Sequence, residues 1–207
     1  MKNKFRYSLT AALFITLFCM SDIFAQRFEV IPFAGYQTGA KIQSYEGEFH
    51  ISGGLTYGLN FALGSSGGPF KVYVSYSRQG SFLEIDTADN IHPVCDLAVH
   101  NVSFGGIYDF LVTDMVNPFT KFGCGTTIYQ PLESDKNNER VMHFNLAGGV
   151  KLYFNEHFGV RFQAGMYLPL FFEGYLFEEG APPPGEGVKT KIAGVHGDFT
   201  AGLIGRF

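Results

Sequence analysis

The sequence predicts an all-β fold, a single closed barrel of eight antiparallel strands joined in up-and-down order. Three observations support this prediction. Apolar residues recur at every second position along eight segments, which is the period of a strand with two different faces. The connections between these segments alternate between short and long. The polar phase is rich in Gly, Ser, Thr and Asn, as expected for side chains inside a narrow barrel.

Composition excludes several other classes of protein. The chain has 207 residues, of which 46% are hydrophobic, 16% aromatic and 16% charged, so it is too apolar to be disordered. Its formal net charge of -4 lacks the basic footprint of a nucleic-acid-binding protein. No internal run approaches the ~20 apolar residues of a membrane-spanning helix, which excludes a helical membrane bundle.

The first residues are typical of a secretory signal peptide. A basic start containing Lys2, Lys4 and Arg6 precedes an apolar run over residues 9–20, and Ala25 offers a small residue for cleavage. We expect cleavage after Ala25. The predicted organisation is therefore a signal peptide over residues 1–25 and one barrel domain over residues 26–207.

The eight segments follow in order. The first, near residues 28–36, has apolar residues in both phases, so the sequence does not assign its faces. The next four have one apolar phase each: Leu55, Tyr57, Leu59, Phe61 and Leu63; Phe70, Val72, Val74 and Tyr76; Val102, Phe104, Tyr108 and Phe110; Phe122, Cys124, Thr126 and Ile128. The last three have these apolar phases: Phe144, Leu146, Gly148, Val150, Leu152 and Phe154; Phe158, Val160, Phe162, Ala164, Met166 and Leu168; Val195, Phe199, Ala201, Leu203 and Phe207.

The connections add an independent constraint. Three are short enough for hairpin turns, at residues 64–68, 112–117 and 155–157. Four are longer and carry most of the acidic residues, and we expect them to be loops, at residues 37–50, 79–95, 130–140 and 173–189. The strict alternation is typical of an up-and-down barrel with all short turns at one end.

The polar phase indicates which face of the strands meets water. A solvent-facing strand surface normally carries more charge and less glycine than this phase does, so an interior location fits it better. Its few long polar side chains are Lys71, Lys121, Lys151, Arg161 and Arg206. Aromatic residues gather beside the short turns, as in a membrane-interface girdle: Phe61, Phe70, Tyr108, Phe110, Phe154 and Phe158. The sequence therefore predicts a transmembrane β-barrel with its apolar faces toward lipid.

Residues 27–207 resemble the small outer-membrane β-barrel proteins of Gram-negative bacteria, the porin-family, eight-stranded barrel domain. The resemblance rests on the signal segment, on Gly-rich alternating strands such as residues 145–154, and on the final pattern Phe199, Leu203 and Phe207, from which Gly205 departs. It implies location in the cell outer membrane, with outer-membrane lipid and the barrel-assembly machinery as partners during insertion.

A search for chemistry assigns no catalytic, cofactor-binding or metal-binding residue. Gly123-Cys124-Gly125 lacks the rest of a nucleotide-binding glycine loop and is interpreted as small residues at the lumen. Four residues resemble metal ligands but match no zinc spacing: His92, Cys95, Asp96 and His100. Cys95 and Cys124 lie in separate segments and are expected as thiols.

Two groups leave alternatives open. His50 and Ser52, with Glu46 and Glu48 close in sequence, would suit a lipid deacylase or acyltransferase at the outer rim, although no family signature surrounds them. Glu178 and Glu179 would suit an interaction with cations, although a solvated acidic loop is their ordinary interpretation. A further set falls on inward phases and would either plug the lumen or line a cleft for an anionic solute: Lys121, His143, Lys151, Arg161, His196, Asp198 and Arg206.

The function that follows is a non-enzymatic integral outer-membrane barrel protein with a role in envelope integrity, surface binding or limited solute passage. The acidic loops offer contact with an extracellular ligand. The alternatives are a lipid-modifying barrel enzyme and a soluble secreted ligand-binding barrel whose apolar face points inward.

Overall fold

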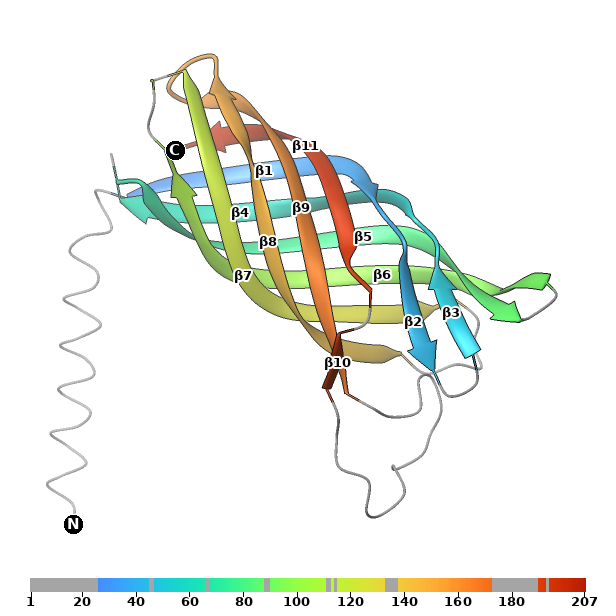
Figure 1. Cartoon of the computed structure of the whole chain (residues 1–207). Coiled ribbons are helices and arrows are strands. Elements are labelled where there is room, and N and C mark those ends of the chain that lie inside the picture. Colours follow the sequence, from blue (N-terminus) through green and yellow to red (C-terminus); the bar gives the residue numbers. More distant parts are fainter. Residues whose placement is uncertain are drawn as a thin grey trace, which may run out of the picture.

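In the computed structural model of the chain, the described residues form one antiparallel sheet that closes as an eight-stranded barrel (Figure 1). The structure describes residues 26–44, 47–65, 68–87, 90–110, 113, 115–132, 138–172, 190–192 and 194–207. The ring strands are β1 (Gln26–Gln37), β4 (Gly54–Ser65), β5 (Phe70–Thr87), β6 (Asn90–Asp109), β7 (Val116–Pro131), β8 (Glu139–Tyr153), β9 (Phe158–Phe172) and β11 (His196–Arg206). Each pairs with the next in this order, and β11 pairs with β1. This confirms the predicted fold class.

Three further strands prolong the ring strands at one end. They are β2 (Ala40–Ser44), which pairs with β3 (Gly47–Ile51), and β10 (Thr190–Ile192), which pairs with β9. At the break between β1 and β2, a Cβ added to Gly39 would lie 2.2 Å from the carbonyl oxygen of Ile51. Glycine is therefore required at position 39, because the backbone there approaches the backbone of Ile51 too closely for a side chain. Among the described residues there is no helix long and apolar enough to cross a membrane.

The two ends of the barrel differ, and we call them the turn end and the hairpin end. The turn end carries the predicted short connections, between β4 and β5, β6 and β7, and β8 and β9. In the last of these, Asn155 Oδ1 accepts hydrogen bonds from the amides of His157 at 2.9 Å and Phe158 at 2.7 Å, which closes the turn. The backbones of Phe28 and Phe207 also exchange two 2.9 Å hydrogen bonds at this end.

The hairpin end corrects two expectations. The segments 37–50 and 79–95, expected as loops, instead contain β2 and β3 and the outer parts of β5 and β6, which have 18 and 20 residues. The register of β5 and β6 shifts beside Pro93, where a residue without an amide hydrogen is accommodated at an irregularity. Residues 1–25, 133–137 and 173–189, which include the predicted signal peptide and Glu178 and Glu179, lie outside the described residues.

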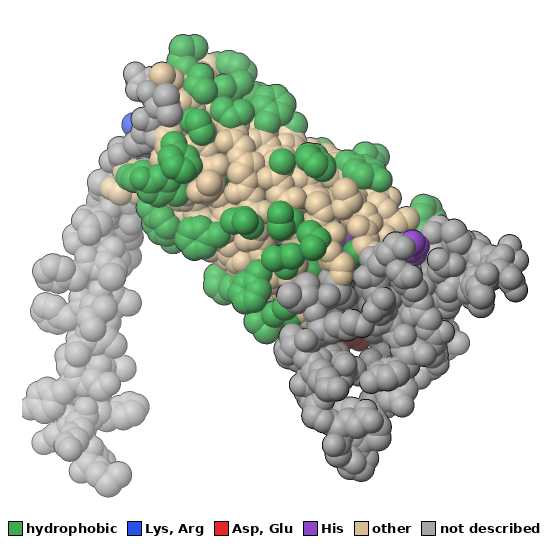
Figure 2. Space-filling view, viewed as in Figure 1, with side chains coloured by type: hydrophobic (Ala, Val, Ile, Leu, Met, Phe, Trp, Pro, Cys, Tyr) green, Lys and Arg blue, Asp and Glu red, His purple; other side chains and the backbone are tan. Residues whose placement is uncertain are grey.

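The side chains follow the predicted orientation. Large apolar residues point outward, as illustrated by Phe104 and Leu203, which are 60% and 65% exposed, whereas Lys151 is fully buried inside. Figure 2 shows hydrophobic side chains spread over the barrel wall between its two ends. The structure also assigns the faces of the first segment, with Phe28 outward and Glu29 inward. The faces of all eight ring strands are therefore apolar outside and largely polar inside.

Candidate functional site: the barrel lumen and its hairpin-end opening

Four charged side chains meet inside the barrel near the turn end. Glu29 on β1 and Asp109 on β6 face Lys71 on β5 and Lys151 on β8. Lys151 Nζ lies 3.0 Å from Glu29 Oε2 and 2.9 Å from Asp109 Oδ1. Lys71 Nζ lies 2.7 Å from Asp109 Oδ2 and also pairs with Glu29. We call these four residues the charge cluster, in which every charge has two partners of opposite sign.

The charge cluster joins strands that are distant in sequence. Its side chains are between 0% and 7% exposed, so each ion has lost most of its hydration. Tyr153 adds a hydrogen bond, because its hydroxyl donates to Glu29 Oε1 at 2.9 Å, and the Arg206 guanidinium lies over the Tyr153 ring at 4.2 Å. Buried ions are tolerated only when such partners are present. The cluster therefore cross-links β1, β5, β6 and β8 and occupies the lumen at this level.

A second group lies farther from the turns. Arg161 on β9 donates to Gln163 Oε1, and Gln163 Nε2 donates to Asp198 Oδ2 at 3.0 Å, which links β9 to β11. Lys121 Nζ lies over the Tyr73 ring, 4.2 Å from its centroid. The second group thus holds two buried cations, one hydrogen-bonded to an amide and the other over an aromatic face, and Gln163 links the Arg161 guanidinium to the Asp198 carboxylate.

A third group centres on His143. Its Nε2 lies 2.8 Å from Ser103 Oγ and its Nδ1 lies 2.8 Å from Thr127 Oγ1. Because the Thr127 hydroxyl donates to Asn101 Oδ1 at 2.8 Å, it accepts from His143 Nδ1. A Cβ on Gly125 would lie 2.8 Å from His143 Nε2, so this glycine makes room for the imidazole. The interpretation of Gly123 and Gly125 as small lumen residues agrees with this packing.

The structure places all the predicted inward residues on the inner phase but divides them among separate groups. Lys151 belongs to the charge cluster, Arg161 and Asp198 to the second group, and His143 to the third. Sequence reasoning missed Glu29 and Asp109. Asp109 lies between the outward-facing Tyr108 and Phe110, so alternation alone was sufficient to place it inside. With these two acids present, the lysines of the cluster do not form a basic cleft.

The seam between β1 and β11 ends near the hairpin end. Its ladder extends to Gln37 and Asp198, and beyond it the Thr38 amide donates to the Gly197 carbonyl at 2.7 Å. Gly197 N in turn donates to Thr38 Oγ1 at 2.8 Å, and His196 Nδ1 lies 3.1 Å from Thr38 O. Farther along, β2 pairs with β3 and β10 pairs with β9. The two sides of the seam therefore diverge after Thr38.

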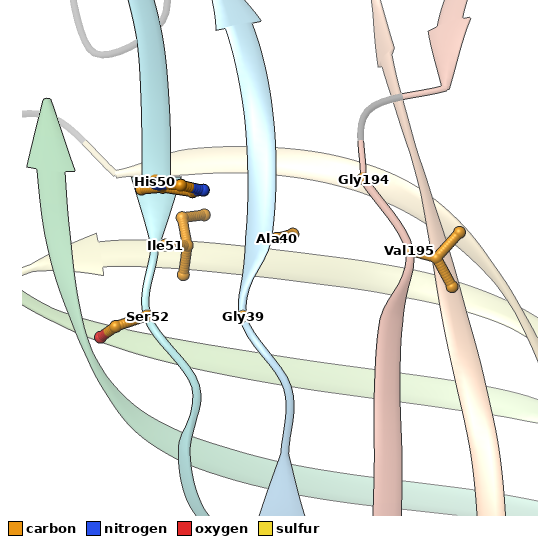
Figure 3. Close-up of a pocket in the computed structure, with 7 residues that line it drawn as sticks. All are labelled: Gly39, Ala40, His50, Ile51, Ser52, Gly194 and Val195. Carbon is orange, nitrogen blue, oxygen red and sulfur yellow. The ribbon is translucent and has the colours of Figure 1, made fainter. Parts of the chain in front are cut away.

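A cavity of about 570 Å³ lies at this divergence. Its lining residues are Gly39, Ala40, His50, Ile51, Ser52, Gly194 and Val195 (Figure 3). Ala40 and Ile51 are buried, whereas Val195 is half exposed on the outer wall. The cavity thus lies at the edge of the barrel wall, with small residues on both sides of the seam.

The predicted base and nucleophile at this rim, His50 and Ser52, do not form a hydrogen-bonded pair among the described side chains. Ser52 Oγ accepts a 2.9 Å hydrogen bond from the Phe82 amide and lies 3.4 Å from Ser81 Oγ. In Figure 3 the Ser52 hydroxyl points away from the strand of Gly39, whereas the His50 ring extends toward that strand. The side chains of Glu46 and Glu48 lie outside the described residues.

The metal-like residues of β6 are distributed over both faces of the wall. Cys95 is buried, Asp96 is exposed, and His100 is half-buried on the outward phase, where its Nδ1 lies 2.9 Å from Tyr76 Oη. The side chain of His92 lies outside the described residues. No disulfide joins Cys95 and Cys124.

A closed eight-stranded antiparallel barrel with an apolar exterior and a charged interior defines the class of the protein. No protein-family model and no curated protein matches the sequence. Among solved structures, the chain is similar to the outer membrane protein OprG from Pseudomonas aeruginosa, with 13% identity, coverage of 88% of this chain and 96% of OprG, and a TM-score of 0.63. It is also similar to Neisserial surface protein A, with 16% identity, coverage of 87% and 97%, and a TM-score of 0.55. These structural neighbours are Gram-negative outer-membrane β-barrels, and the likeness is one of fold.

Proposed function

We propose that the chain is a non-enzymatic integral outer-membrane barrel protein that acts in envelope integrity or surface binding. The observation that supports this most strongly is the division between the two faces of the wall. Residues such as Phe104 and Leu203 are exposed outside, and the four ions of the charge cluster are buried inside. In water, this division would expose the apolar outer side chains to solvent. In a bilayer, it places them against the hydrocarbon of the lipid.

The proposal includes export and insertion. Residues 1–25 act as the cleaved signal peptide, and the barrel domain spans residues 26–207. Outer-membrane lipid surrounds the wall, and the barrel-assembly machinery inserts it. The turn end then faces the periplasm, and the hairpin end faces the outside, where β2, β3, the outer parts of β5 and β6 and the cavity at the seam are available to an extracellular ligand.

One experiment tests location, signal cleavage and barrel folding together. Cells expressing the chain are fractionated, and the envelope protein is run on a gel with and without heating. We expect the protein in the outer-membrane fraction, with an N-terminus at Gln26 and a faster-migrating unheated form. Partition of the folded, mature protein into water without detergent would overturn the proposal in favour of a soluble barrel.

The buried lumen groups support a plugged barrel rather than a pore. Charged and aromatic side chains from facing strands contact one another at the level of the charge cluster and again at the second group. We expect no stable conductance when the purified protein is added to planar bilayers. Reproducible single-channel steps would contradict this part of the proposal and favour limited solute passage.

The use of Ser52 in backbone hydrogen bonding supports a non-enzymatic role. A lipid deacylase or acyltransferase would require its hydroxyl for attack on a carbonyl. We expect Ser52→Ala and His50→Ala to leave both the lipid A profile of the cells and esterase activity unchanged. If expression of the original protein modifies lipid A and both variants lose this modification, the protein is an enzyme instead.

A further inference from the structure

Between the short turns and the level of Arg78, the outer wall formed by β4 to β7 carries one charged side chain in a surface that is otherwise apolar or weakly polar. On β4, β5, β6 and β7, the outward phase from the short turns up to the paired positions Tyr57, Arg78, His100 and Ile128 contains Arg78 as its single formally charged residue. The next paired position, on β8, is Arg140, which is also exposed on the outward phase. Placing an ionisable side chain on a lipid-facing surface costs free energy, so the presence of Arg78 there indicates a function and a binding partner. This inference rests on the proposed membrane location.

Arg78 lies at a depth suited to a lipid headgroup. It is eight residues beyond Phe70, the first residue of β5 at the turn end. At ~3.3 Å per residue and a strand tilt of ~40°, this corresponds to roughly 20 Å along the barrel axis. The apolar band of such barrels is ~25 Å tall. Arg78 is therefore near the boundary of the outer leaflet, within reach of the headgroups.

The neighbours of Arg78 provide further polar contacts. Arg78 Nη1 donates to Tyr57 Oη at 3.0 Å on β4, and on β6 its paired position is His100. Tyr76, two residues earlier on β5, places its hydroxyl 2.9 Å from His100 Nδ1, with the two rings 6.0 Å apart. We call Tyr57, Tyr76, Arg78 and His100 the Arg78 cluster. Both tyrosines are about half exposed.

The charge of the cluster is not neutralised within the described part of the chain. No described carboxylate lies within ion-pair distance of Arg78, in contrast to the lysines of the charge cluster. A guanidinium has five N–H donors arranged as a fork, and Tyr57 accepts only one hydrogen bond from it. The remaining donors match the oxygens of a phosphate, which arginine binds in a bidentate manner.

We propose that the Arg78 cluster binds the phosphate of a lipid A molecule in the outer leaflet. The guanidinium pairs with the phosphate oxygens, and the tyrosine hydroxyls lie at the headgroup level, where amphipathic rings are favoured. The acyl chains lie along the wall on the turn-end side of the cluster, where Val74 and Val102 are exposed. The occupant is thus an anionic lipid held at its headgroup and along its chains.

The test uses the full barrel, purified and folded in detergent, with lipid A as the probe and native mass spectrometry to count the bound lipid. We expect Arg78→Gln to weaken lipid A retention at least about tenfold, because a charge-assisted hydrogen bond is lost. Arg27→Gln is the matched control, since Arg27 is an exposed arginine at the turn end, and it is expected to leave retention unchanged. Lipid A stripped of its phosphates is expected to bind the original protein as weakly as lipid A binds Arg78→Gln.

Several outcomes overturn the assignment. Equal retention by Arg78→Gln in a barrel that still shows the heat-dependent gel shift would remove the site while leaving the proposed function intact. Displacement of lipid A by an equal concentration of inorganic phosphate would indicate a free anion instead of a lipid. If Arg78→Gln does not fold, Arg78→Met replaces it, and unchanged retention by a folded Arg78→Met barrel would have the same meaning. A protein that needs no detergent would contradict the membrane location and this inference with it.

Discussion

The seam between β1 and β11 is closed differently at the two ends of the barrel. At the turn end, Phe28 and Phe207 close the seam with two backbone hydrogen bonds, and the charge cluster ties together four strands in the interior. At the hairpin end, the seam diverges after Thr38, and the space beside it is a cavity of about 570 Å³. The difference indicates that the seam is sealed by backbone hydrogen bonds at the turn end and opens at the opposite end, which leaves the rim there available for contacts with other molecules.

The largest expected effect comes from the charge cluster. Lys151→Met should leave Glu29 and Asp109 with Lys71 as their remaining partner among the described cations, and we expect a loss of about 3–5 kcal/mol of unfolding free energy. The measurement is urea unfolding of the barrel in lipid vesicles. Lys121→Met is the matched control, because Lys121 is also buried but contacts the Tyr73 ring instead of a carboxylate. Equal losses in the two variants would show that the cluster has no special role.

A pair of alanines compares packing at the two ends directly. Ala147 and Ala40 are both buried, at 8% and 7% exposure, but Ala147 lies in the packed lumen and Ala40 lines the cavity. We expect Ala147→Leu to cost about 1–3 kcal/mol through overpacking. Ala40→Leu is expected to change stability by less than about 0.5 kcal/mol. A comparable cost at both positions would mean that the cavity does not accommodate a larger side chain.

A smaller loss than at Lys151 or Ala147 is expected at the edge of the seam. Thr38→Val removes the hydroxyl that accepts from the Gly197 amide, at a cost of about 0.5–1.5 kcal/mol. Hydrogen exchange should become faster at Gly197 and stay unchanged at the amides of Phe28 and Phe207. Faster exchange at both ends would show that the two parts of the seam open together.

The sequence predicts most of the wall because lipid imposes a simple pattern on it. Outward residues such as Phe104 and Phe162 must be apolar, so their period is visible without any knowledge of contacts. The interior has no such rule, because Ile31 and Tyr153 pack there beside Glu29. This mixture made the first segment ambiguous and hid an acid of the charge cluster.

The hairpin end was predicted less well for a related reason. Beyond the apolar band a two-stranded ribbon need not alternate between lipid and lumen, so Glu84, Ile85 and Asp86 read as a loop although they belong to β5. The cavity depends on where the pairing of β1 and β11 stops, and the sequence contains no signal for that register. The depth of Arg78 becomes apparent only once the neighbouring strands are aligned.

The long β5–β6 ribbon has a practical consequence. From Arg78 to Thr87, β5 continues for nine residues while paired with β6, which is roughly 30 Å of strand. With the hairpin end facing outward, as proposed above, such a ribbon would carry its tip away from the lipid surface. A short epitope inserted between Thr87 and Asn90 would then be displayed to antibodies on intact cells, which makes the ribbon a natural attachment point for surface display.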